Sequence, residues 1–150
     1  MNNRNEISTL NSLIATTIDS IDGYETATGD ATNQQFASMF QSAASERRGV
    51  LQDLRAEVVR LGGEPEDDGT VLASAHRMFL NLRNAVTGKD DKAIVAEVER
   101  GEDHIKAKFE DAIADLDLNA DTKAIIESGF ITVKRGHDKM RDLKHGLGAM

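Results

Sequence analysis

Apolar residues recur at three- and four-residue intervals along most of the chain, a spacing typical of amphipathic helices. This spacing predicts four long helices, over about residues 5–28, 33–61, 90–116 and 121–145. A shorter one-sided pattern predicts a further helix over about residues 71–87. No stretch alternates apolar and polar residues as a half-buried strand does, so we expect an all-α fold.

Residues that break or cap helices lie between these stretches. The single proline, Pro65, lies in GGEPEDDG, and Gly62 and Gly63 directly follow the second long stretch, where glycine commonly ends a helix. Thr70 is the expected N-cap of the shorter helix and Asp121 that of the last helix.

The short helix determines the expected topology. At about four or five turns it is too short to be a fifth bundle member, and it is too apolar to be a free linker. We therefore expect residues 1–150 to form one domain, in which two antiparallel helix pairs are joined by a short crossover helix. This is the four-helix bundle with one long connection, the ferritin-like arrangement.

Composition excludes several classes of protein. The net charge of −8 argues against binding along a nucleic-acid backbone. No apolar run approaches the ~20 residues of a membrane span, and the first residues lack the apolar stretch of a signal peptide. The absence of cysteine excludes disulfides, thiol catalysis and thiolate metal sites, and makes a cytoplasmic location the default expectation.

Several stretches resemble a known family. They are LNSLIATTIDSIDGY, ASERRGVLQDL, VKRGHDKMRDL and above all the segment from Leu61 to Asp103, with its LGG turn and its HR and ERGE sequences. Together they resemble an uncharacterised bacterial family of ferritin-like four-helix bundles, catalogued as a domain of unknown function. The resemblance covers nearly the whole chain and implies the ferritin-like fold. It implies no activity, because the family has no established one.

A ferritin-like bundle raises the hypothesis of a carboxylate-bridged metal site in its core. Such sites take one Glu from each of two helices and a Glu-x-x-His pair from each of the other two. Here Glu46 is followed three residues later by Gly49, and His137 is preceded three residues earlier by Lys134. Neither pair is complete, so the sequence favours no metal site.

The four candidate ligands, Glu25, Glu46, Glu102 and His137, are also not expected to converge. Helical-wheel geometry places Glu102 and His137 on the inner flanks of their helices, within about one turn of each other. Glu46 falls at the edge of its apolar stripe. Glu25 is the carboxylate nearest the inner stripe of the first helix, but it lies roughly 13 Å further along the axis.

Arg47 lies at the centre of the apolar stripe of its helix, where a lone charge would be costly. If the helices over 33–61 and 90–116 run parallel, Arg47 and Glu102 lie at similar depth. We therefore expect them to pair in the core, with His137 completing a buried polar network. Gly129 and Gly136 fall on the inner side of the last helix, which indicates close packing or room for a bulky neighbour.

Two function classes follow from these residues. The first is a non-enzymatic bundle without a cofactor, with a structural, interaction or stress-related role. The second is a divergent metal-binding or oxidative protein that uses Glu102 and His137 to hold iron or another divalent metal. The broken ligand motifs favour the first. Ile131, on the outer side of the last helix, suggests a homo-oligomer contact, and we expect neither nucleic acid nor membrane as a partner.

Overall fold

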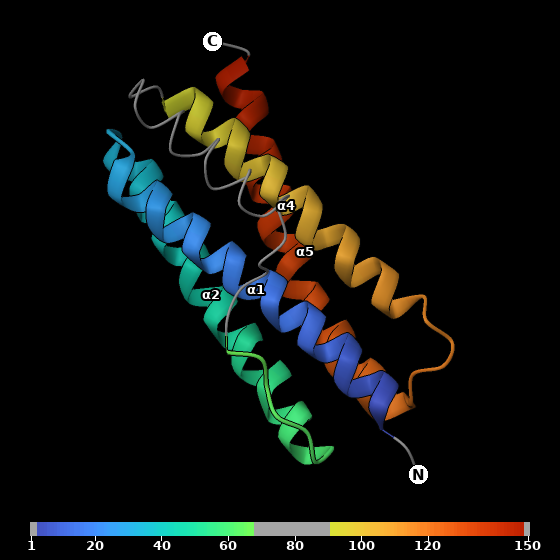
Figure 1. Ribbon diagram of the computed structural model, residues 1–150. Helices are drawn as coiled ribbons and strands as arrows, with labels where there is room; N and C mark the ends of the chain where they lie inside the picture. The colour runs from blue at the N-terminus through green and yellow to red at the C-terminus, as the bar shows by residue number, and fades with distance from the viewer. Residues whose placement is uncertain (1–2, 68–90, 149–150) are drawn as a thin grey trace.

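A computed structural model describes residues 3–67 and 91–148 of the chain. These residues form α1 (Arg4–Asp30), α2 (Gln34–Arg60), α4 (Asp91–Ile113) and α5 (Ala120–Gly148), as Figure 1 shows. The described residues include no strand, which confirms the all-α prediction. The predicted helix over 71–87, with its Thr70 cap and its crossover role, lies outside the described residues.

The ends of α2 follow from its flanking sequence. The side chain of Asn33 accepts hydrogen bonds from the backbone N–H groups of Gln35 and Phe36, at 2.8 and 3.2 Å. These N–H groups lie in the first turn, where the helix itself offers them no acceptor. At the other end Gly62 adopts a φ of 86°, a left-handed conformation that favours glycine. The N–H groups of Gly62 and Gly63 then bond back to the last turn of α2.

The start of α5 corrects one expectation. Asn119, and not Asp121, caps this helix, because its side-chain oxygen accepts a hydrogen bond of 2.8 Å from the N–H of Thr122. Asp121 lies inside the first turn, where a carboxylate is favourable beside the positive end of the helix dipole.

The helices pack so that α1 and α5 each contact both α2 and α4. The pairs α2 with α4 and α1 with α5 therefore lie on the two diagonals of the bundle. Asp91, at the start of α4, accepts hydrogen bonds of 2.9 Å from the backbone N–H groups of Thr32 and Asn33, which immediately precede α2. The two helices thus begin at the same end and run parallel (Figure 1).

The buried apolar side chains form two clusters along the bundle. One contains Leu10, Leu13, Ile14, Ile21, Val50, Leu51, Leu54, Val58, Ile105, Phe109, Ala112, Leu118, Ile126 and Val133. The other contains Tyr24, Ala27, Phe40, Ala43, Ala44, Ile94, Val95, Val98 and Met140. On three helices the residue between the two clusters is Arg47, Glu102 or Gly136, so a polar layer separates them. None of the described helices is both long and apolar enough to cross a membrane.

Candidate functional site

Arg47 is the centre of the polar layer. Its side chain starts on α2, is only 1% exposed and reaches the other three helices. The guanidinium forms an ion pair with Glu102 on the diagonally opposite helix α4 and donates a 2.8 Å hydrogen bond to the hydroxyl of Ser20 on α1. It also approaches the backbone carbonyl of Val133 on α5, at 3.4 Å. One side chain therefore ties all four helices together at mid-bundle.

Tyr24 completes the surroundings of the charged pair. Its ring centroid lies 5.7 Å from the guanidinium carbon of Arg47, within the range of a cation–π interaction. Burial and the Glu102 carboxylate raise the pKa of Tyr24 well above its usual value, so the phenol stays neutral. Burial alone would lower the pKa of Arg47, but Glu102, together with Tyr24 and Glu46, outweighs it and the pKa is raised. The layer therefore holds a charged guanidinium beside a neutral phenol.

Gly136 on α5 makes room for this pair. A Cβ atom at this position would lie 2.6 Å from Nη2 of Arg47 and 3.4 Å from Oε2 of Glu102. The first distance is too short for a carbon and a nitrogen that are not bonded, so alanine would force the guanidinium to move. The bulky neighbour that the sequence indicated for this glycine is thus Arg47.

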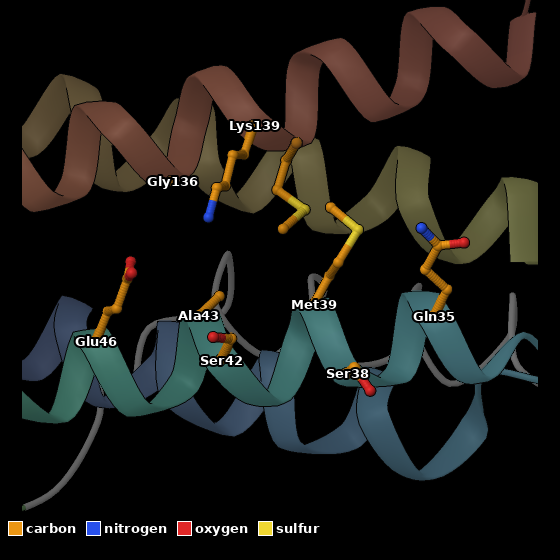
Figure 2. Close-up of a pocket in the computed structure, with 9 residues that line it drawn as sticks. Gln35, Ser38, Met39, Ser42, Ala43, Glu46, Gly136 and Lys139 are labelled. Carbon is orange, nitrogen blue, oxygen red and sulfur yellow. The ribbon is translucent and has the colours of Figure 1, made fainter.

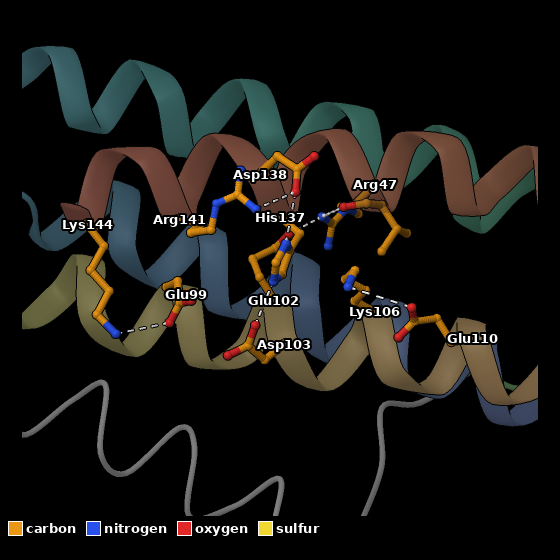
Figure 3. A network of polar contacts seen from close by, with 11 residues as sticks. Arg47, Glu99, Glu102, Asp103, Lys106, Glu110, His137, Asp138, Arg141 and Lys144 are labelled. Carbon is orange, nitrogen blue, oxygen red and sulfur yellow. Dashed lines mark hydrogen bonds and ion pairs between the residues drawn. The ribbon is translucent and has the colours of Figure 1, made fainter. Parts of the chain in front are cut away.

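His137 is placed differently from the expectation that it would complete the network. Its Nε2 lies 2.6 Å from Oδ1 of Asp103 on α4, and its Nδ1 lies 3.3 Å from Oδ1 of Asp138 (Figure 3). It therefore hydrogen-bonds to these two carboxylates and not to Arg47 or Glu102. The Lys144 ammonium lies 3.3 Å from Glu99 on the same seam between α4 and α5.

The remaining two metal candidates, Glu25 and Glu46, are not buried in the core. Glu25 is exposed and forms an ion pair with Arg48, so its expected place on the inner stripe is wrong. It follows the buried Tyr24 by one residue, which rotates it about 100° around α1 and towards solvent. Glu46 is half-buried in a groove between α2 and α5, where it points towards Lys139 (Figure 2).

The sequence did not single out two further buried carboxylates, those of Glu6 and Glu57. The Glu57 carboxylate accepts hydrogen bonds from Thr122, at 2.9 Å, and from Arg60, at 2.6 Å. The hydrogen bonds from Arg60, aided by Thr122, outweigh burial and lower the pKa of Glu57 from its ordinary value of 4.5. A signal was present, because Glu57 follows Leu54 by three residues and so shares its buried face.

The polar layer does not fit a carboxylate-bridged pair of metal ions. Among the described residues the buried carboxylates are those of Glu6, Glu57 and Glu102, and only Glu102 lies in the layer. Its oxygen is engaged by a guanidinium, which would repel a cation and compete for the ligand. No chemistry is therefore derived through such a centre.

The described structure is that of an all-α protein with four long helices and a charged pair buried among them. The chain belongs to the family described as a domain of unknown function (DUF2383), whose model matches residues 5–115. The matched region includes Arg47, Glu102 and Asp103 but ends before α5, which carries Gly136 and His137. No curated protein matches the chain.

Proposed function

We propose that the protein is a non-enzymatic, ferritin-like helical bundle with a structural or interaction role. The observation that carries this proposal is the Arg47–Glu102 pair, which fills the middle of the core with a fixed positive charge and its counter-ion. Bundles that bind metals build their sites from acidic and histidine side chains facing this region. Here the same region holds the four helices in register.

The ferritin-like part of the proposal is supported by the helix arrangement. α1 packs against α2, and α4 packs against α5. α2 ends at the opposite end of the bundle from the start of α4, as a bundle with one long connection requires (Figure 1). The stress-related setting expected from the sequence stays a prediction.

The alternative, an oxidative protein that uses Glu102 and His137, has less support. Glu102 is paired with Arg47 and enclosed in the core, whereas His137 turns towards Asp103. The two side chains thus engage different partners and do not form a shared ligand set.

Oxidation of ferrous iron tests the proposal. Purified protein mixed with ferrous iron should consume oxygen at the rate of buffer alone, because the core residues that the structure describes do not include the ligands that would hold two irons. Turnover above that rate which is lost in Glu102→Ala would support the oxidative alternative and overturn the proposal. Turnover that survives in Glu102→Ala would also overturn it, by showing an activity elsewhere in the chain.

The proposal includes self-association in the cytoplasm. Ile131 is 66% exposed on the outer face of α5, beside the partly buried Phe130. Light scattering should find an oligomer that Ile131→Lys dissociates. Leu116→Lys is the matched control, because Leu116 is also exposed but lies in the loop between α4 and α5. A monomeric wild-type protein, or equal effects of the two substitutions, would contradict this part of the proposal.

A further inference from the structure

A second group of polar side chains lies beside the polar layer, on the seam between α4 and α5. Glu99 and Asp103 of α4 and His137 of α5 each offer one ligand atom, and these three atoms lie within 4.8 Å of one another. Glu99 and Asp103 are four residues apart, so they share one face of α4. We propose that this group binds one divalent transition-metal ion of the Zn²⁺ type through two carboxylate oxygens and the His137 Nε2.

The chemistry of the three ligands fits such an ion. Zn²⁺ takes carboxylate oxygen and imidazole nitrogen at about 2.0–2.2 Å, often with three protein ligands and one water. Ligand atoms at those bond lengths lie about 3.3 Å apart in a tetrahedron. His137 Nε2 and Asp103 Oδ1, which are 2.6 Å apart, must therefore separate slightly to accept an ion between them, which is easy for Asp103, because its side chain is 59% exposed. That exposure also gives a hydrated ion access from solvent.

Asp138 provides independent support, because it is not one of the three ligands. Its carboxylate oxygen Oδ1 lies 3.3 Å from Nδ1 of His137. A carboxylate at that distance favours a proton on Nδ1, so Nε2 is the nitrogen available to an ion that replaces its hydrogen bond to Asp103. A carboxylate behind a metal-binding histidine is the usual arrangement in such sites.

Two neighbouring cationic side chains affect the binding of an ion to this group. The ammonium of Lys144 lies 3.3 Å from Glu99, and the guanidinium of Arg141 lies within 3.5 Å of Asp138 (Figure 3). Lys144 is about half exposed and can turn into solvent, so an ion would displace it from Glu99. An imidazole binds an ion through an unprotonated nitrogen, so protons compete with the ion at Nε2.

Calorimetric titration of the full chain with Zn²⁺ in a non-coordinating buffer tests the proposal. We expect one ion per chain, with affinity that falls on acidification, and no competition from equimolar Mg²⁺, which prefers oxygen ligands. His137→Gln and Asp103→Asn should each weaken binding at least tenfold. Asp138→Asn should weaken it by about 10- to 100-fold, the usual effect of losing the partner of a metal-binding histidine. Lys144→Ala should strengthen it.

His104→Gln is the matched control, because His104 adjoins Asp103 in sequence but is exposed and outside the group. It should bind Zn²⁺ as the wild type does. The proposal is overturned if the wild type shows no saturable binding, or if His137→Gln and Asp103→Asn bind as tightly as the wild type. Loss of Zn²⁺ binding in His104→Gln together with normal binding in His137→Gln would overturn it, because the ion would then bind at another site. If His137→Gln fails to fold, the binding measured for Asp103→Asn still tests the proposal, once circular dichroism has shown that this variant is folded.

Discussion

Glu102 and Asp103 are neighbours in the sequence, and each pairs with a cationic or protonatable side chain from another helix. The Glu102 side chain is 2% exposed and pairs with Arg47, whereas that of Asp103 is 59% exposed and pairs with His137. One residue of rotation on α4, about 100°, separates a closed site from an open one. The closed site excludes water and ions and can only stabilise the fold. The open site can exchange its partner for a proton or a metal ion.

The same division occurs on α5. Gly136 faces the closed pair and leaves room for it, while His137, the next residue, faces the open seam. The neighbours Glu102 and Asp103 on α4 and the neighbours Gly136 and His137 on α5 thus define the closed and the open site. This comparison predicts that substitutions at Arg47, Glu102 or Gly136 affect stability far more than those at Asp103 or Lys144.

The largest expected effect is that of breaking the closed pair. Arg47→Ala and Glu102→Ala should each reduce the free energy of unfolding by about 3–5 kcal/mol, because each leaves a buried charge without its partner. The double variant should lose clearly less than the sum of the two, since the second substitution removes the unpaired charge. Denaturant unfolding of the three variants measures this.

Asp103→Ala is the control for this cycle, because it removes a carboxylate one residue away that faces solvent. Its cost should be about 1 kcal/mol or less, as for other exposed pairs. Strict additivity of Arg47→Ala and Glu102→Ala, or an equal cost for Asp103→Ala, would show that the two sites do not differ in the way that we infer.

The second effect concerns the glycine beside the pair. Gly136→Ala should destabilise the protein by about 1–3 kcal/mol, because its Cβ would collide with the Arg47 guanidinium and force it to move. Gly49→Ala on α2 is the matched control: beyond its chain neighbours and the nearby backbone of its own helix, no atom lies within 4 Å of the added Cβ, so the change should stabilise by roughly 0.5–1 kcal/mol. Denaturant midpoints that shift in the same direction for both variants would contradict the role of Gly136.

The sequence predicted much of this architecture, because helical periodicity and turn residues are local signals. The predicted helices over 5–28 and 33–61 differ from α1 and α2 by one or two residues at each end. The helix expected over 90–116 ends at Ile113, and that expected over 121–145 extends from Ala120 to Gly148. Such differences arise at helix ends, where capping side chains such as Asn119, at the start of α5, determine where the helix begins.

The candidate site was harder to predict. A helical wheel places Arg47 and Glu102 on inner faces, and the structure brings them together, because a buried charge has few alternatives to a buried counter-ion. For His137 the wheel could not choose between Glu102 and Asp103, which differ by one residue of rotation. The contacts of Arg47 with Ser20 and Tyr24 depend on the path of a long flexible side chain, and periodicity carries no information on that.

The third prediction concerns the pair of Glu57 and Arg60, whose exposure to solvent is intermediate between those of the closed and the open site. The Glu57 carboxylate is buried, while Arg60 is half exposed. Its lowered pKa means that protonation is opposed in the folded state. The resulting stabilisation is present above the unfolded-state pKa and is lost as the pH falls through the folded-state value, below 4.5. Urea unfolding between pH 7 and pH 3 should therefore show an acid-side loss that is smaller in Glu57→Gln.

Two controls sharpen this prediction. Thr122→Val removes one hydrogen bond to the carboxylate and should cost about 1 kcal/mol at neutral pH. Glu127→Gln changes an exposed carboxylate on α5 and should leave the acid-side profile unchanged. An unchanged profile in Glu57→Gln would mean that this carboxylate does not contribute to acid sensitivity.

The smallest effect, and the most direct comparison of the two sites, is their response to salt. Lys144→Ala removes the cation that pairs with Glu99 on the open seam, and should cost about 0.2–1 kcal/mol at low salt. At about 1 M salt the Debye length falls to about 3 Å, so this cost should disappear. The cost of Arg47→Ala should persist, because water and ions do not reach the closed pair. Unfolding in urea at both salt concentrations measures the difference. A cost of Arg47→Ala that salt removes would show that the pair is open to solvent, and the contrast between Glu102 and Asp103 would then have no physical basis.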